Sequence, residues 1–159
     1  MSENGCLKIY EQDENEEIIL TPNEYNQILN IQQLILEKIA SHEPTSKILA
    51  KLCLLAESLL PNAVASIMLK NKETGLMNVR TAPSIPQNGQ DKLGNLKPGP
   101  NGGACGNAVF KNKPQFVQNT FIDDRWTNLR DIAIDFNICA CWSMPIRNKK
   151  KEAIGSFAL

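Results

Sequence analysis

A glycine-rich stretch at residues 99–106 constrains the fold of this chain more than any other part of the sequence. Four of its eight residues are glycine, at positions 99, 102, 103 and 106. Glycine permits backbone conformations and close approaches that other residues block, so the stretch predicts a tight turn. We expect a short helix to begin there. Its first amide groups would point into the space that the turn encloses and form a modest site for an anion or a dipole.

Two amphipathic helices are expected before this turn. Thr21, Pro22 and Glu24 form a helix start, with a threonine cap, a proline in the first turn and a glutamate at the capping-box position. Apolar residues then recur at helical spacing over residues 25–39. A second apolar stripe over residues 48–60 predicts another helix, which ends where Pro61 follows.

The rest of the chain predicts mostly strands. Two runs at 64–69 and 76–82 are separated by a turn, and two more at 138–146 and 153–159 are separated by a lysine-rich turn, as in antiparallel hairpins. Apolar residues over 126–136 recur at helical spacing. The predicted fold class is therefore α+β: a central antiparallel sheet with the N-terminal helices on one face and a pocket covered by loops on the other.

Composition narrows the class of protein further. With 159 residues and 42% hydrophobic content, the chain can bury one core and is too short for two ordinary domains. Lys plus Arg equals Asp plus Glu at 17 each, so no overall positive field favours nucleic acid. No apolar run reaches the roughly 18 residues that span a bilayer, and the start lacks a basic secretory signal, so we expect a cytoplasmic protein without a membrane partner.

Five short motifs occur in a characteristic order, at residues 82–86, 99–106, 124–126, 140–146 and 155–159. Together they resemble the GAF domain, a small-molecule-sensing and dimerising module found mostly in signalling proteins. The resemblance covers about residues 35–159. It is closest to the bacterial subfamily that precedes cyclic-di-GMP-metabolising, histidine-kinase or other output domains.

The domain organisation follows from these patterns. Residues 1–20 are polar and acidic, and we interpret them as a flexible arm. Residues 21–159 would form one GAF domain whose usual last helix is missing after the final strand. The stripe on the first helix is broad enough to need more than one neighbour. Either both of its sides pack on the core of the domain, or one side pairs with a second chain in a near-parallel homodimer. The stripe consists of Tyr25, Ile28, Leu29, Leu34 and Ile35.

A ligand-binding cavity is expected at Cys105, Trp126, Cys141 and Ser143. Strand alternation places the small Cys141 and Ser143 on one face, where they leave room. Cys105 from the glycine-rich turn and Trp126 from an acidic-aromatic turn would close the same space. The long loop at 83–103, with at most one helical turn, would be the lid. The alternative is that these side chains pack together as a second small core.

The function that the resemblance implies is a signal-input domain. It would bind an unidentified small molecule or sense redox state, and relay the change to a downstream output domain. The alternative is a ligand-free dimerisation module. Trp142, on the other face of its strand, is expected to be a core aromatic.

A third interpretation is an enzyme like the free methionine-(R)-sulfoxide reductase, because Cys105 aligns with a redox-active cysteine of that class. Its second cysteine falls at Gln115 and its substrate-binding carboxylate falls near Cys141, so we expect no catalysis. No cofactor or metal is expected either. Bilin-binding domains need a cysteine followed by histidine, haem needs an axial ligand, and the lone His42 lies far from the pocket motifs.

Overall fold

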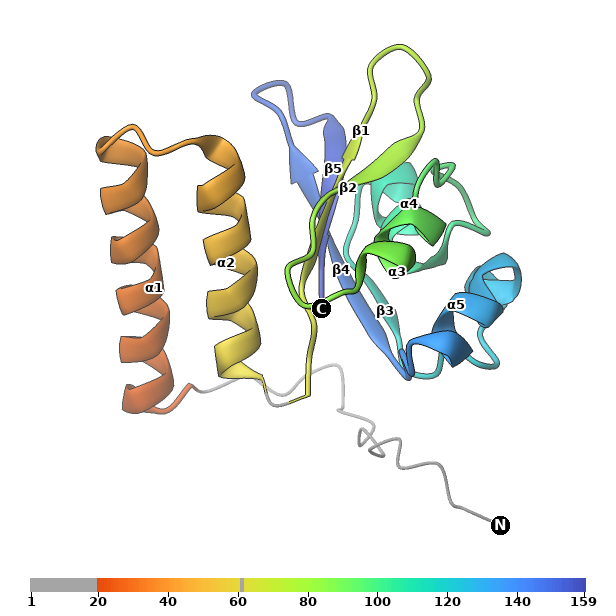
Figure 1. The fold of residues 1–159 in the computed structure, drawn as a ribbon, viewed down its shortest axis with the longest axis horizontal. Helices are drawn as coiled ribbons and strands as arrows, with labels where there is room; N and C mark the ends of the chain where they lie inside the picture. Colours follow the sequence, from red (N-terminus) through yellow and green to blue (C-terminus); the bar gives the residue numbers. More distant parts are fainter. Residues whose placement is uncertain (1–19, 61) are drawn as a thin grey trace.

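The computed structural model describes residues 20–60 and 62–159, so the predicted acidic arm lies outside the described residues except for Leu20. The described part begins with a helical hairpin beside a sheet (Figure 1). Its helices are α1 (Pro22–Ala40) and α2 (Thr45–Leu59). The predicted capping box is confirmed: Thr21 Oγ1 accepts from the Glu24 amide at 3.3 Å, and Glu24 Oε2 accepts from the Thr21 amide at 2.8 Å.

The five strands form one antiparallel sheet in the order β2-β1-β5-β4-β3. They are β1 (Ser66–Lys70), β2 (Met77–Thr81), β3 (Gln115–Val117), β4 (Cys141–Arg147) and β5 (Ala153–Ala158). The central position of β5 demands a close approach, because a Cβ on Gly155 would lie 2.3 Å from the Met68 carbonyl oxygen of β1. Glycine is therefore required where these two strands meet.

The two faces of the sheet carry different layers (Figure 1). On one face α2 packs through Cys53 against Ala65 and Ile67, all three of which are at most 1% exposed. The helix α1 has no buried residue and lies outside α2 as a third layer, so it does not pack into the core. The opposite face is covered by α4 (Gly103–Lys111), a 3₁₀ segment η1 (Asp124–Leu129) and α5 (Arg130–Asp135).

The expected lid has more structure than the sequence indicated. It contains the six-residue helix α3 (Gln87–Lys92), where at most one turn was expected. Its second half crosses the start of α4 at close range. A Cβ on Gly102 would lie 2.7 Å from the Lys97 carbonyl oxygen, and the Gly99 amide donates to the Gly106 carbonyl oxygen at 3.3 Å. The prediction of a tight glycine turn is confirmed, and Gly103 has a φ of +60°.

One aromatic residue is not where the sequence placed it. The expectation that Trp142 is a core aromatic is wrong, because its side chain is 41% exposed. It stacks on Phe116 of the neighbouring strand β3, with ring centroids 5.8 Å apart and planes 12° from parallel. On this face α2 covers the half of the sheet around Ile67 and Phe157, and Trp142 belongs to the other half.

Candidate functional site

The strand β4 turns its small side chains toward α4, as alternation predicts. Cys141 is 8% exposed and Ser143 is fully buried, whereas Trp142 and Met144 are exposed by 41% and 36%. In the register of β4 with β5, Ser143 lies opposite Ala158 and Pro145 opposite Ser156. Residues on one face of paired strands alternate, so Ser156 joins Ser143 on the α4 side.

Cys105, in the first turn of α4, lies next to this pair of strands. Interaction with the Cys141 thiol lowers the pKa of Cys105 to about 7, and the nearby Ser143 and Ser156 hydroxyls also lower it. Burial has the opposite effect and is outweighed. Contact with Cys105 and burial raise the pKa of Cys141. One thiol of the pair is therefore poised to ionise near neutral pH while the other keeps its proton.

Trp126 completes the predicted group from η1. Its side chain is 4% exposed and packs in one core cluster with Ala104 and Cys141, against which Cys105 also lies. A Cβ on Gly103 would be 3.6 Å from Trp126 Nε1, so the indole nitrogen faces the start of α4. The structure thus brings all four predicted residues together at one place, under the N-terminal half of α4.

Several buried polar atoms at this place lack an ordinary hydrogen bond. Within the described residues, four buried side-chain atoms have no partner, and three of them are Trp126 Nε1, Ser143 Oγ and Ser156 Oγ. Buried polar groups are nearly always paired, so such atoms call for an explanation. Sequence reasoning missed Ser156 because its orientation depends on the strand register. Its position beside Gly155 on a predicted strand gave no chemical signal.

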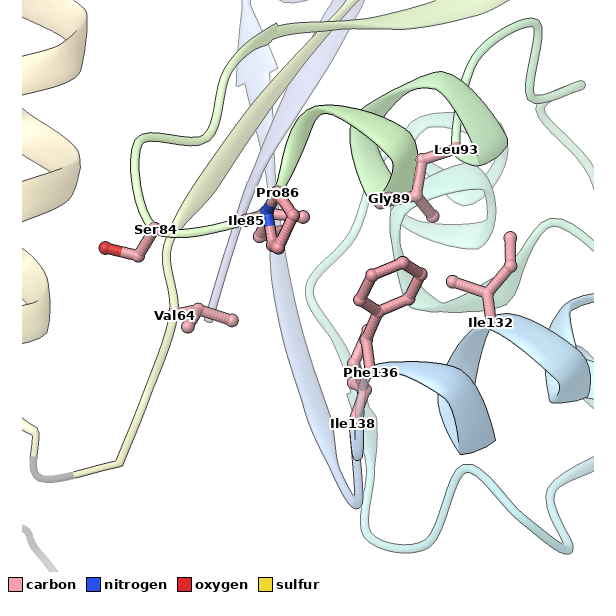
Figure 2. Close-up of a pocket in the computed structure, with 9 residues that line it drawn as sticks. All are labelled: Val64, Ser84, Ile85, Pro86, Gly89, Leu93, Ile132, Phe136 and Ile138. Atoms are coloured by element: carbon pink, nitrogen blue, oxygen red, sulfur yellow. The ribbon is translucent and has the colours of Figure 1, made fainter.

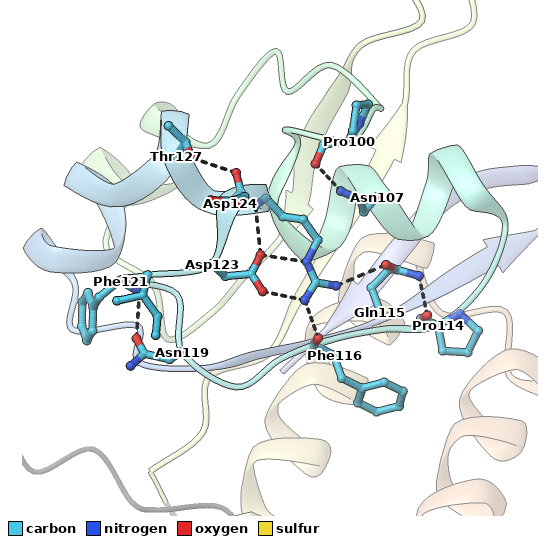
Figure 3. A network of polar contacts seen from close by, with 12 residues as sticks. Pro100, Asn107, Pro114, Gln115, Phe116, Asn119, Phe121, Asp123, Asp124 and Thr127 are labelled. Carbon is cyan, nitrogen blue, oxygen red and sulfur yellow. Dashed lines mark hydrogen bonds and ion pairs between the residues drawn. The ribbon is translucent and has the colours of Figure 1, made fainter. Parts of the chain in front are cut away.

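A polar clasp holds the η1 segment against the edge strand β3 (Figure 3). Arg125 Nη2 donates to Asp123 Oδ2 at 2.6 Å and to the Phe116 carbonyl oxygen at 2.8 Å, and Arg125 Nη1 donates to Gln115 Oε1 at 3.3 Å. The Arg125 guanidinium lowers the pKa of Asp123, and the carboxylate raises the pKa of Arg125. The clasp fixes the segment that delivers Trp126. It also occupies Gln115, where the reductase resemblance would place a cysteine.

A small cavity lies between α3 and α5 (Figure 2). Its volume is about 70 Å³, room for only a few waters. It is lined mainly by apolar side chains from both helices and the segments beside them: Val64, Ser84, Ile85, Pro86, Gly89, Leu93, Ile132, Phe136 and Ile138. Its one hydroxyl, Ser84 Oγ, already donates to Glu57 at 2.6 Å. The cavity therefore offers a ligand almost no polar recognition.

A larger groove runs between the lid and α4. Its volume is about 610 Å³, within the range of small-molecule sites. Its lining includes two lysines, three asparagines and the exposed ring of Phe110, and none of the lining residues is acidic. The lining residues are Lys92, Gly94, Asn95, Leu96, Lys97, Pro98, Gly99, Pro100, Asn101, Gly102, Phe110, Asn128 and Leu129.

Neither hollow is lined by any of the four predicted ligand-binding residues. Cys105, Trp126, Cys141 and Ser143 are clustered as expected, but that they enclose a cavity stays a prediction. The predicted lid does border the larger groove, which reaches the start of α4 at Gly102.

Residues 20–60 and 62–159 hold no group of three or more His, Cys, Asp or Glu side chains placed to bind a metal ion. Within the same residues, no helix combines the length and the apolar character needed to cross a bilayer.

Comparison with known proteins assigns this arrangement to a class. The GAF domain family model matches residues 44–159, so the chain belongs to the GAF domain family. The match begins just before α2, and α1 precedes it. The α+β fold predicted from the sequence is that of the family.

Individual relatives agree with this assignment. A methyl sulfide methyltransferase-associated sensor from Methanosarcina acetivorans is 28% identical over 153 residues, which is 96% of this chain and 14% of the relative. Two solved structures share the fold. The GAF domain of a phosphoenolpyruvate-protein phosphotransferase from Coxiella burnetii is 14% identical with a TM-score of 0.66, covering 84% of this chain and 76% of that one. The reduced form of fRMsr from Staphylococcus aureus is 19% identical with a TM-score of 0.62, covering 88% and 81%.

Proposed function

We propose that this GAF domain is the signal-input unit of a sensory protein, and that it binds a small molecule or responds to redox state beneath α4. The observation that carries the proposal is the cluster of Cys105, Cys141, Ser143 and Ser156. It combines a thiol with a pKa of about 7 and two buried hydroxyls without ordinary hydrogen bonds. A buried site whose hydroxyls have only an ionisable thiol to interact with is suited to a ligand or an oxidant, whereas a purely structural core gains nothing from such groups.

The similarity to a protein named as a sensor supports the same proposal. In this proposal the chain has no catalytic activity of its own. The output lies in another part of a longer protein, and the helices α1 and α2 carry the signal to it. The fold is shared with fRMsr, but Gln115 is engaged by Arg125 and offers no second thiol.

A thermal-shift panel of metabolites, read together with native mass spectra of the purified chain, tests the ligand-binding form. A ligand at 100 times its dissociation constant should add about 2.7 kcal/mol of stability. Ser143→Phe should abolish the shift by filling the space beside α4. Met144→Phe, one residue along on the opposite face, is the matched control and should leave it intact. Equal loss in both variants would place the ligand elsewhere.

The redox form has its own test. Treatment with hydrogen peroxide, followed by intact-mass and peptide analysis, should modify Cys105 before any other described cysteine. Silence across the metabolite panel and an unmodified Cys105 would together contradict the sensory proposal. They would leave the dimerisation module as the function to test.

That second candidate function is favoured by an exposed seam on α1. The spacing of Tyr25, Leu29, Gln32, Leu36 and Ile39 alternates between four and three residues, which is the core pattern of a coiled coil. The four apolar members are 50–65% exposed. The apolar stripe predicted on α1 therefore has two parts. Tyr25 and Leu29 belong to the exposed seam, and the other three residues are half-buried on this helix, whose neighbour in the described part of the chain is α2. They are Ile28, Leu34 and Ile35.

We therefore propose a homodimer through the α1 seam, with Gln32 as the single polar position that fixes the register. Light scattering should give the mass of a dimer for the native chain. Leu36→Glu should give a monomer, whereas the control Gln27→Glu, exposed on another side of α1, should remain dimeric. A native chain that is monomeric at high concentration would contradict this proposal without touching the sensory one.

A further inference from the structure

Two thiols from different elements meet beneath α4. Cys105 is the third residue of that helix, and Cys141 opens the strand β4 on which the helix packs. Cys141 belongs to a core cluster against which Cys105 lies, and each thiol acts directly on the ionisation of the other. The described part of the chain has three free cysteines, and the third, Cys53, lies on the opposite face of the sheet. Cys105 and Cys141 are therefore the two free thiols in that part that can react with each other.

The two thiols differ in the way that a stepwise oxidation requires. Cys105 is half-buried whereas Cys141 is 8% exposed, so an oxidant in solution meets Cys105 first. The Cys141 thiol is the main cause that lowers the pKa of Cys105 to about 7, and contact with Cys105 raises the pKa of Cys141. The thiolate, rather than the thiol, is the nucleophile. Cys105 therefore has the properties of the thiol that is oxidised first, and Cys141 has those of the thiol that reacts second.

We propose that Cys105 and Cys141 form a reversible disulfide between α4 and β4 when a hydroperoxide oxidises the chain. In the first step the Cys105 thiolate attacks one oxygen of the hydroperoxide. An S–O bond forms and the O–O bond breaks, and the other oxygen takes a proton from solvent and leaves as water or an alcohol. The product on Cys105 is a sulfenic acid.

In the second step the Cys141 sulfur loses its proton and attacks the Cys105 sulfur. The S–S bond forms and the S–O bond breaks, and the hydroxide leaves with a proton as water. The two sulfurs have then given two electrons to the hydroperoxide. This inference rests on the redox form of the proposed function and names its product.

The surroundings of the pair favour its return to the thiol form. The Ser143 and Ser156 hydroxyls both lower the pKa of Cys105, and their Oγ atoms have no ordinary hydrogen-bond partner within the described residues. They stabilise the thiolate, and they lose it as a partner when the disulfide forms. A dithiol whose reduced form is stabilised makes a disulfide that is readily reduced. The link is therefore suited to a reversible response rather than to permanent stabilisation of the fold.

Mass spectrometry of the purified chain tests the pairing. Hydrogen peroxide, followed by alkylation and by digestion without reductant, should give a peptide linked through Cys105 and Cys141, with two hydrogens lost and no oxygen added. Cys139 and Cys141 share one tryptic peptide, because no Lys or Arg separates them, so fragment ions must assign the bond. Dithiothreitol should remove the link and restore both thiols.

Variants separate the two steps. Cys141→Ser should stop the reaction at the sulfenic acid, which dimedone traps on Cys105. At equal loss of the Cys105 thiol, the trapped fraction should be on the order of tenfold higher than in the native chain, because the thiol that reacts second is missing. Cys53→Ser changes the free cysteine on the other face and is the matched control. It should form the link as the native chain does.

The serine hydroxyls provide a readout that a merely structural role would not change. In dithiothreitol redox buffers at about pH 8, where Cys105 is mainly thiolate, Ser156→Ala should raise the equilibrium ratio of disulfide to dithiol several-fold. Ser66→Ala is the matched control, because Ser66 is a buried serine on the same face that does not act on Cys105. It should leave the ratio unchanged.

The inference is overturned if peroxide converts Cys105 to a sulfenic or sulfinic acid and no link to Cys141 forms. The redox form of the proposed function would then stand with another product. It is also overturned if Cys105 links to a different cysteine or stays unmodified, and in the last case a metabolite that stabilises the chain would still support the sensory function. Equal shifts of the dithiothreitol equilibrium in Ser156→Ala and Ser66→Ala would contradict the role of the hydroxyls in making the disulfide reversible.

Discussion

The two faces of the sheet hold cysteines in opposite chemical states. On the α2 face, burial and the neighbouring Glu57 carboxylate raise the pKa of Cys53 to about 11, and the residues around it are apolar. On the α4 face, Cys105 has a pKa of about 7 among thiols and hydroxyls. One face therefore holds a thiol that stays protonated at neutral pH, and the other holds a thiol that ionises near it. Burial alone therefore does not decide the reactivity of a thiol, because the neighbouring side chains determine whether its pKa rises or falls.

The largest expected effect is on thiol alkylation. At pH 7 Cys105 should react with iodoacetamide on the order of a hundredfold faster than Cys53, because its larger thiolate fraction outweighs its lower intrinsic nucleophilicity. The Cys105 rate should rise with pH and level off above about pH 7, where the thiolate predominates. Peptide mapping by mass spectrometry measures both rates. Comparable alkylation rates of Cys105 and Cys53 in the folded chain would contradict the proposed difference between the two faces. As a control, the two rates should be equal in urea, where the chain is unfolded.

The second effect is on stability at the α2 face. Ile67→Ala should lower the free energy of unfolding by about 2–5 kcal/mol, because Ile67 is 1% exposed in an apolar cluster and its truncation leaves a cavity. Urea titration measures the loss. The matched variant Ile134→Ala, at a side chain that is 64% exposed on α5, should cost far less. A similar loss in the free energy of unfolding at both positions would show that packing around Ile67 contributes no more to stability than an exposed side chain does.

The third effect is on the polar clasp beside β3, whose contribution to stability should depend on pH. Asp123→Asn should cost about 1–3 kcal/mol at pH 7, because charged hydrogen bonds to Arg125 are lost. The folded pKa of Asp123 lies below its ordinary value. Its contribution is therefore complete above the unfolded value of about 3.9 and is lost as pH falls through the folded one.

Urea titrations of native and variant chains at pH 7 and below pH 3 check this sign. The two chains should converge in acid. Asp124→Asn, at the exposed neighbouring carboxylate, is the control and should show a much smaller difference at pH 7. A difference that persists in acid would mean that the clasp acts through packing rather than through charge.

The smallest effect on stability is expected at Ser156, whose Oγ has no ordinary hydrogen-bond partner within the described residues. Ser156→Ala should change the free energy of unfolding by less than about 1 kcal/mol, in either direction, because no ordinary hydrogen bond is lost. The pKa of Cys105 should rise in this variant, since Ser156 helps to lower it. Thermal unfolding and the pH profile of alkylation measure the two changes. A large loss of stability with an unchanged thiol would show that the hydroxyl is structural.

Much of this contrast could be predicted from local patterns. The capping box at Thr21, the stripe of α2 and the alternation of Cys141 and Ser143 each depend on neighbours within a few residues. These predictions are confirmed. The grouping of Cys105 and Trp126 with β4 was argued from the glycine-rich turn, the long loop and strand alternation, and the structure brings these residues together.

Other features depend on contacts between distant segments. Ser156 joins the cluster only because β5 pairs with β4 in one register, and a shift by one residue would turn it away. Trp142 is exposed because α2 covers only part of its face. The six residues of α3 form a helix that packs closely on α5, where Gly89 meets the ring of Phe136. Tertiary packing, rather than local propensity, determines each of these.

Where the lid crosses α4, one set of atoms attaches the loop to the helix and another set lines the groove. The loop is held to α4 through its own backbone atoms: the Lys97 carbonyl oxygen lies against Gly102, the Gly99 amide donates to the Gly106 carbonyl oxygen, and the Pro100 carbonyl oxygen accepts from the Asn107 side chain. The side chains at positions such as 95, 97 and 101 play no part in that attachment, although they line the groove. The lining of the groove can therefore change by substitution of loop side chains alone, with the backbone contacts between the loop and α4 unchanged. A panel of such loop variants would be a starting library for retuning the domain to new chemical inputs.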